Sequence, residues 1–420
     1  MAGALEGVRV LDCTQIIAGP LAGQLLSEMG ADVVKVEPLE GEPWRLQAEI
    51  VPKESRGYIN VNRGKRSIAL DFKNPDSAVV RDSLIRWCDV LLTNYRPGVA
   101  EALGIDYESA RKVKPDLIYC ENTAFGKAGP DADRRGYDIV AQAMSGLALS
   151  NGQVANGLPT IIAFAPADIV TGVAMAWAIS AALFHRERTG EGQAINTSLL
   201  LSSLFLQAGA KQINALDEEP RNRRLRMLAE ARERGAGIEE VMAERKALTP
   251  ELLGNIYYRI YRTADGYLAV GCLGPGPRAR FRKALGVVDA RYEPGFESTP
   301  ENVRAEGARL TEACEAAFCT RSTAEWIAHL DTHDVAAGPV RFVDELIDDP
   351  QVVANNYLVD YDHTLLGPMR SNAPIVQMSG TPTRIQRASP ALGEHTDDIL
   401  SEVGFDDAQV QRLRDGGVVS

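Results

Sequence analysis

The first forty residues carry the pattern that most restricts the fold of this chain. A short apolar run beginning at Val8 (VRVLD) leads into a Gly19-Pro20 turn, a segment with helical spacing (LAGQLLSEMG) and a second apolar run (ADVVKVE). Two apolar strands that flank one helix form a βαβ unit, in which the strands are parallel. The strand pattern returns in CDVLLTN and DLIYCENTAFG. The sequence therefore predicts an α/β domain with an open parallel sheet.

Two glycine motifs are incomplete in this domain. The first turn lacks the GxGxxG spacing that holds a pyrophosphate in dinucleotide-binding proteins. Gly64-Lys65 resembles the end of a P-loop, but no glycine stands five positions earlier, and Arg66 replaces the magnesium-binding Ser or Thr. Two interpretations of this basic stretch stay open, namely a solvated turn and a phosphate-binding patch.

One carboxylate, Asp168, stands immediately before an apolar segment that runs from Ile169 to Phe184. The pattern predicts a buried helix with Asp168 as its cap, where helix N–H groups favour the ionised carboxylate. A carboxylate at a helix start beside a cleft can also act as a nucleophile, and the N–H groups can stabilise an oxyanion. The apolar segment is shorter than a membrane span requires, so we expect no membrane segment.

Composition excludes several classes of protein. The 420 residues predict two or three domains, and 45 basic against 57 acidic residues give a net charge of -12, which disfavours binding to nucleic acid or anionic membranes. The six cysteines form no CxxC pair, so neither a disulfide framework nor a zinc site is indicated, and a cytoplasmic location fits best. His329 and His333 lack a third ligand and are expected to be surface histidines.

The pattern changes twice in the second half of the chain. Residues 217–247 are rich in Glu and Arg at helical spacing, which indicates exposed or bridging helices. From Asn255, two strands joined at Asp265-Gly266 open a smaller domain. We therefore predict four segments: 1–205 as the first part of the large α/β domain, 206–250 as a helical linker, 251–335 as a small α+β domain, and 336–420 as a return segment that completes the large domain.

Several motifs, taken together, resemble the family III CoA-transferases, the group that includes formyl-CoA transferase and crotonobetainyl-CoA:carnitine CoA-transferase. In chain order they are GVRVLD, AGPLAGQLLSEMGADVVKVE, NRGKRSIALD, LLTNYRPG, GYDIVAQAMSGL, ADIVTG, RERTGEGQ, ADGYLAVG and PALGEHT. Their order and spacing cover most of the chain. The resemblance implies a Rossmann-like large domain built from both chain ends, a small domain from the middle, and two ring-shaped subunits interlocked as a homodimer.

The resemblance also implies roles for single residues. The family nucleophile falls on Asp168, and the family's glycine-rich loop over the reacting carboxylate corresponds to Gly271, Gly274 and Gly276, although prolines interrupt it here. CoA would be held through Leu70, Lys73, Asn94, Tyr95, Arg135 and Tyr137. Lys65, Arg66 and Arg96 add cations for its phosphates. The acyl pocket is expected at Gln15, Ile16, Ile17 and Ala18, and a CoA thioester is expected as substrate, with no metal and no permanently bound cofactor.

The implied reaction is transfer of CoA from an acyl-CoA to a carboxylic acid. Asp168 attacks the thioester and forms a mixed anhydride, the released CoA thiolate converts it into an aspartyl thioester, and an acceptor carboxylate reverses these steps. Formyl-CoA transferases carry Gln where this chain has Ile17, which disfavours oxalate. The apolar pair Ile16 and Ile17 indicates a larger acyl group, such as a dicarboxylate or a branched acid.

Two alternatives stay open. α-Methylacyl-CoA racemases share the fold and pair the matching Asp with a His, where this chain has Tyr137. A phenol with a pKa near ~10 is a poor base at neutral pH, so the transferase is favoured. The second alternative is a CoA-binding protein that has kept the fold without catalysis.

Overall fold

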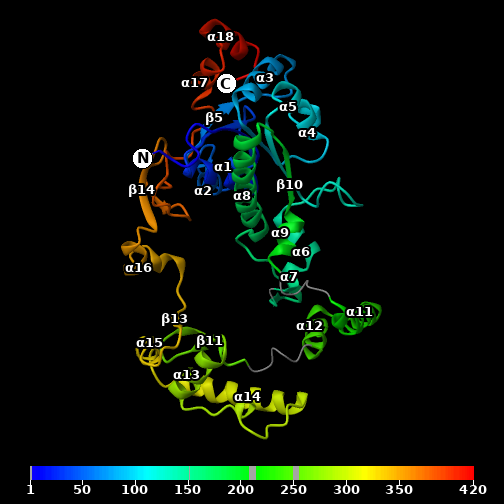
Figure 1. Ribbon diagram of the computed structural model, residues 1–420, viewed down its shortest axis with the longest axis vertical. Coiled ribbons are helices and arrows are strands. Elements are labelled where there is room, and N and C mark those ends of the chain that lie inside the picture. The colour runs from blue at the N-terminus through cyan, green and yellow to red at the C-terminus, as the bar shows by residue number, and fades with distance from the viewer. Residues whose placement is uncertain (1, 151, 208–213, 249–254) are drawn as a thin grey trace. The chain divides into compact units, whose positions relative to one another are not determined.

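The computed structural model describes residues 2–150, 152–207, 214–248 and 255–420 (Figure 1). The chain divides into two compact units, the first of Met1–Ile213 with Ala354–Ser420 and the second of Asn214–Val353. The first unit thus joins both chain ends, whereas most of the predicted linker and residues 336–353 fall into the second unit. Residues 208–213 and 249–254, which bracket the linker's ends, lie outside the described residues. The predicted domain boundaries stay a prediction.

The first unit contains a six-stranded sheet in the order β10-β7-β6-β1-β2-β5. All neighbouring strands in it are parallel, which confirms the predicted α/β fold. Its strands are β1 (Arg9–Cys13), β2 (Asp32–Glu37), β5 (Arg66–Ala69), β6 (Val90–Thr93), β7 (Ile118–Thr123) and β10 (Ala194–Ser198).

Helices cover both faces of this sheet, which explains why its strands are continuous apolar runs. Successive residues point to opposite sides, so Val10 packs with α1 (Ala18–Glu28) and α8 (Pro166–Thr189), and Leu11 with the helices of the other face. That second face carries α3 (Ala78–Trp87), α5 (Tyr107–Val113), α17 (Thr396–Glu402) and α18 (Asp407–Asp415). The last two helices come from the C-terminal end of the chain.

Smaller elements complete the first unit. They are α2 (Arg56–Asn62), α4 (Val99–Leu103), α6 (Asp138–Ser145), α7 (Leu147–Ser150), α9 (Leu199–Phe205), the hairpins β3–β4 (Glu49–Val51, Glu54–Ser55), β8–β9 (Val154–Ala155, Leu158–Pro159) and β14–β15 (Leu358–His363, Gly367–Asn372), and α16 (Pro350–Ala354), which crosses the boundary between the units.

Helix α8 is longer than the apolar segment from which we predicted it. Its 24 residues are long and apolar enough to cross a membrane, so the length of this helix does not by itself exclude a membrane span. Half of its most apolar stretch is buried within the protein. Gly172 permits a close crossing with α1, because a Cβ atom there would lie 2.7 Å from the carbonyl oxygen of Ala18. We interpret α8 as a core helix whose composition reflects this packing.

The second unit is built around a three-stranded antiparallel sheet of β11 (Tyr258–Arg262), β12 (Tyr267–Gly271) and β13 (Ala337–Pro339). The first two strands form the predicted hairpin. Helices α13 (Pro275–Leu285), α14 (Pro300–Phe318) and α15 (Thr323–Asp331) share an aromatic core with it, in which the Tyr261 and Phe318 rings stack 4.3 Å apart. Helices α11 (Glu218–Glu233) and α12 (Ile238–Ala247) are exposed, as predicted, with only Ala231 buried.

Candidate active site

A cavity of about 340 Å³ opens at the carboxyl edge of four adjacent strands. Loops that leave this edge of a parallel sheet are where α/β proteins bind ligands. Each of the four strands contributes residues that immediately follow or end it: Gln15 and Ile16 after β1, Asn94 to Arg96 after β6, Asn122 to Ala124 at the end of β7, and Leu199 after β10.

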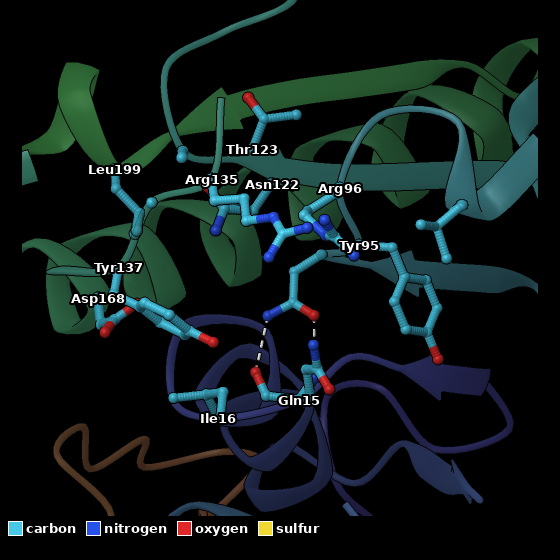
Figure 2. Close-up of a pocket in the computed structure, with 14 residues that line it drawn as sticks. Gln15, Ile16, Tyr95, Arg96, Asn122, Thr123, Arg135, Tyr137, Asp168 and Leu199 are labelled. Atoms are coloured by element: carbon cyan, nitrogen blue, oxygen red, sulfur yellow. Dashed lines mark hydrogen bonds between the residues drawn. The ribbon is translucent and has the colours of Figure 1, made fainter. Parts of the chain in front are cut away.

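The remaining wall comes from α8 and the segment that leads into α6. Figure 2 shows Asp168 and Tyr137 together at one side of the cavity, the Arg135 and Arg96 guanidinium groups in the middle of the view, and Ile16 below them. The structure thus brings together Gln15, Ile16, Asn94, Tyr95, Arg96, Arg135, Tyr137 and Asp168, all of which the sequence analysis had singled out.

Asp168 does not cap α8, contrary to the sequence-based expectation. The helix begins at Pro166 after Ala165, which has a left-handed backbone with φ of 53°, and Asp168 makes no capping hydrogen bond. The cap is supplied by Asp138, whose Oδ1 accepts hydrogen bonds from the N–H groups of Ala167 at 2.7 Å and Asp168 at 3.2 Å. These two N–H groups already donate to Asp138, so they are not available to stabilise an oxyanion as predicted.

The environment of Asp168 disfavours its charge. Burial, together with the neighbouring carboxylate of Asp138, raises the pKa of Asp168 to about 7. Among the residues that the structure describes, no donor forms a hydrogen bond with the Asp168 carboxylate. The expectation that a capping position would favour ionisation was therefore wrong, because desolvation and like charge dominate here. A carboxylate with a pKa near neutrality is characteristic of a catalytic group.

Gln142 fixes Asp138 in turn. Its Nε2 donates to Asp138 Oδ2 and to the carbonyl oxygen of Ile162 at 3.0 Å, while its Oε1 accepts from the N–H of Ile162 at 2.9 Å. Gln142 and Asp138 lie one turn apart in α6, so this helix holds the side chain that caps α8 in a fixed position.

Arg96 and Arg135 are the cations of the cavity. Neither forms an ion pair within the described part of the chain, and Figure 2 shows both side chains directed into the cavity. Guanidinium groups that are free to bind are well suited to phosphate and carboxylate groups. Asn94 has a different task, because its amide accepts from the N–H of Gln15 at 2.9 Å and donates to the Gln15 carbonyl at 2.7 Å.

Lys65 and Arg66, which we had assigned to the phosphates of CoA, do not line the cavity. The Lys65 ammonium is fully buried and donates to Asp12 at 2.7 Å, to the Pro20 carbonyl at 2.7 Å and to Asn62 at 2.8 Å, which uses all three of its protons. Arg66 pairs with Asp32 and Glu402. Both cations are paired with carboxylates of the protein itself, so the structure corrects the phosphate-binding interpretation of this stretch.

Four other predicted residues also lie outside this cavity. Leu70 is buried where it pairs with Val419, and Lys73 is exposed in the turn that follows. Ala18 is buried, and Ile17 lines a neighbouring cavity of about 250 Å³ together with Trp44. The predicted acyl-pocket residues are therefore divided, with only Gln15 and Ile16 facing Asp168's cavity.

The predicted glycine loop belongs to the second unit. Gly274 has φ of 87° and is followed by Pro275, which begins α13, so the prolines turn the end of this loop into a helix start. The proposed position of Gly271, Gly274 and Gly276 over the reacting carboxylate stays a prediction.

Sequence reasoning missed three polar residues of the site. Asp138 and Gln142 build the start of α8, and Asn122 lines the cavity with a buried Oδ1 that has no hydrogen-bond partner among the residues with described coordinates. Asn122 could have been found, because it stands at the end of a predicted strand of a parallel sheet. Asp138 could not, since its contact with α8 joins residues about thirty positions apart.

Known proteins match this chain over nearly its whole length. The family model described as CoA-transferase family III matches residues 5–396. The chain belongs to this family. A succinate–glutarate CoA-transferase of Agrobacterium fabrum is 34% identical to this CoA-transferase, and the match covers 95% of each chain. A formyl-CoA:oxalate CoA-transferase of Rhodopseudomonas palustris is 33% identical over 100% of this chain and 98% of its own.

Solved structures show the same fold. The crystal structure of a CAIB/BAIF family protein from Brucella suis is 28% identical to this CoA-transferase and superposes with a TM-score of 0.72. The match covers 96% of this chain and 100% of that chain.

Proposed function

We propose that this CoA-transferase moves CoA between carboxylic acids through covalent intermediates on Asp168. One observation carries the proposal: a single buried carboxylate with a pKa of about 7 stands at one end of a cavity that also holds two guanidinium groups, neither of which has an ion-pair partner among the described residues. A raised pKa makes the ionised carboxylate more basic and hence more nucleophilic. The guanidinium groups suit the phosphates of a CoA thioester.

The first half of the reaction loads the enzyme. An Oδ atom of ionised Asp168 attacks the thioester carbonyl, the C–S bond breaks, and a mixed anhydride and CoA thiolate form. The thiolate then attacks the aspartyl carbonyl, which releases the donor acid as a carboxylate and leaves CoA on Asp168 as a thioester.

The second half returns CoA to a new acid. The acceptor carboxylate attacks the aspartyl thioester and releases the thiolate, and the thiolate attacks the acceptor's carbonyl in the second anhydride. Asp168 leaves as a carboxylate, so every bond that forms on it is also broken. Each substrate step needs only the thioester and an acid, so we propose no metal and no permanently bound cofactor.

We propose a short dicarboxylic acid as acceptor. The Agrobacterium relative is named for succinate and glutarate, and the Rhodopseudomonas relative for formyl-CoA and oxalate. Ile16 places an aliphatic side chain in the cavity, which favours an acid with a methylene chain over oxalate. Asn122 offers an amide for the distal carboxylate of such an acid.

We also propose that the protein works as a homodimer in the cytoplasm, with the interlocked arrangement that the family resemblance implies. Support comes from a groove of about 620 Å³ along α8 and α9, lined by the exposed residues Val173, Trp177, Leu201 and Phe205. Exposed apolar patches of this kind mark contacts between proteins. All six cysteines are unpaired, in keeping with a reducing compartment.

A trapping experiment tests the covalent mechanism. The protein is incubated with succinyl-CoA and hydroxylamine and then analysed by mass spectrometry of its peptides. We expect a hydroxamate on Asp168 that depends on the thioester. A protein that instead exchanges the α-proton of 2-methylacyl-CoA in heavy water and forms no hydroxamate would be a racemase, and one that does neither while binding CoA would be catalytically idle.

A further inference from the structure

The turn between β1 and α1 holds one residue in an unfavourable backbone conformation. Ile16, which lines the cavity of Asp168, has φ of 72°. The left-handed region is unfavourable for residues other than glycine, and for a β-branched residue it is a genuine outlier. Such a conformation persists only where the surrounding structure enforces it, and it is concentrated at functional sites.

A buried ion pair enforces this conformation. Glu42 Oε2 accepts a hydrogen bond from the N–H of Ile16 at 2.7 Å, and Lys35 Nζ donates to the carbonyl oxygen of Thr14 at 2.6 Å. The two side chains also pair with each other, with Lys35 Nζ and Glu42 Oε1 3.1 Å apart, and both are buried. The Lys35–Glu42 pair therefore hydrogen-bonds to the backbone on both sides of Gln15.

Other backbone groups of the turn have hydrogen-bond partners as well. Asn94 takes both the N–H and the carbonyl of Gln15, and Asp12 accepts from the N–H of Thr14 at 2.9 Å. The turn ends at α1, whose first residue packs against α8 four residues beyond Asp168. A change of φ at Ile16 would therefore redirect the Gln15–Ile16 peptide and the Ile16 side chain inside the cavity.

We propose that the Lys35–Glu42 pair is a positioning device that keeps the Ile16 turn in its left-handed conformation and so sets the shape of the cavity beside Asp168. Neither residue lines the cavity, so the pair acts through the turn. The kinetic part of this proposal rests on the proposed CoA transfer, whereas the coupling between Glu42 and Ile16 does not.

A double-mutant cycle with Glu42→Ala and Ile16→Gly tests the device. Glycine adopts positive φ without steric cost, so in the Ile16→Gly background the conformation of the turn depends less on the hydrogen bond to Glu42. In the parent background, we expect Glu42→Ala to lower kcat/KM for transfer from succinyl-CoA to glutarate on the order of a hundredfold. In the Ile16→Gly background, we expect the same substitution to lower kcat/KM by less than about tenfold. KM for succinyl-CoA should change little in either case, because Arg96 and Arg135 are untouched.

Glu54→Ala is the matched control. Glu54 is also buried and ion-paired, but with Arg45, and it forms no hydrogen bond to residues 14–17. Its loss of activity should be the same in both backgrounds. If Glu42→Ala also caused equal losses in both backgrounds, its role would be merely structural and the proposal would be overturned.

Two further measurements keep the outcome decisive. Chemical denaturation of the same four proteins should show that the effects of Glu42→Ala and Ile16→Gly on stability are not additive, and additive effects would contradict the device even if the protein transferred no CoA. If the Glu42→Ala protein does not fold, Glu42→Gln replaces it in the cycle. Gln keeps an acceptor for the Ile16 N–H, so the Glu42→Gln protein should retain kcat/KM within about tenfold of the parent. A larger loss that persists in the Ile16→Gly background would count against the proposal.

Discussion

Asp138 Oδ1 accepts a hydrogen bond from the backbone N–H of Asp168 at 3.2 Å, so two carboxylates share the start of one helix. The first receives the N–H groups of that helix, and the second receives none. This division explains how one site can hold two acidic side chains with different tasks. Asp138 builds the helix start, and its charge contributes to the raised pKa of Asp168.

Asp168→Asn should make the protein more stable at alkaline pH. The pKa of Asp168 is about 7 in the folded protein against 3.8 in an unfolded chain, so the unfolded chain loses this proton first. Stability is then lost as pH rises from about 4 to 7 and stays constant above that. The variant lacks this loss and should exceed the parent by up to about 4 kcal/mol at pH 8, but not at pH 3.5. Urea denaturation at several pH values measures the difference, and a constant difference would argue against the raised pKa.

Asp138→Asn should shift the pH dependence of transfer. The Asn oxygen can still accept from the helix N–H groups, but the negative charge beside Asp168 is gone. The acid limb of kcat/KM, expected at pH about 7 in the parent, should therefore move to lower pH. Initial rates with succinyl-CoA and glutarate between pH 5 and 9 measure this. A limb that stays in place while overall activity drops would show that Asp138 acts on the helix alone.

The sequence predicted the strands and the apolar helix that carries Asp168, because apolar runs are local signals, but it wrongly made Asp168 the cap of that helix. The sequence could not show that Lys65 is neutralised inside the protein whereas Arg96 faces the cavity. Both follow strand-like or turn-like segments, and only the fold shows that Asp12, more than fifty positions earlier, neutralises Lys65. The left-handed backbone of Ile16 was hidden for the same reason, since Glu42 enforces it through a tertiary hydrogen bond.

Arg135→Ala and Arg134→Ala form a matched pair. Arg135 lines the cavity, whereas its neighbour pairs with Asp131 at 2.8 Å and does not line it. A lost hydrogen bond to a charged group costs about 1.5–3 kcal/mol, so Arg135→Ala should raise KM for succinyl-CoA about tenfold to a hundredfold. The Arg134→Ala enzyme should stay within about twofold of the parent. Steady-state kinetics at two salt concentrations distinguish them, and equal effects of the two substitutions would remove Arg135 from CoA binding.

Lys65→Met should destabilise the protein without weakening CoA binding. It leaves the carboxylate of Asp12 buried without its main cation, and removal of one partner of a buried pair costs about 3–5 kcal/mol. The exposed control Lys73→Met should change stability by less than about 0.5 kcal/mol. Denaturation gives the stability, and KM for succinyl-CoA, measured below the unfolding temperature, should match the parent. A raised KM for the stable fraction of Lys65→Met would restore the phosphate-binding role.

Gly172→Ala tests whether the close crossing of α1 and α8 maintains the geometry of the cavity. The new Cβ would lie 2.7 Å from the Ala18 carbonyl oxygen and 3.0 Å from Leu21 Cβ, so one helix must shift. Overpacking of this kind costs about 1–3 kcal/mol.

Because α1 begins directly after the Ile16 turn, the same shift moves that turn relative to Asp168. We expect kcat to fall about tenfold to a hundredfold, with KM for succinyl-CoA nearly unchanged. Gly380→Ala is the control, since its Cβ would meet no atom within 4 Å. Denaturation and steady-state kinetics on both variants give the answer. A Gly172→Ala protein that loses stability but keeps its full kcat would show that the helix crossing supports the fold and not the geometry of the site.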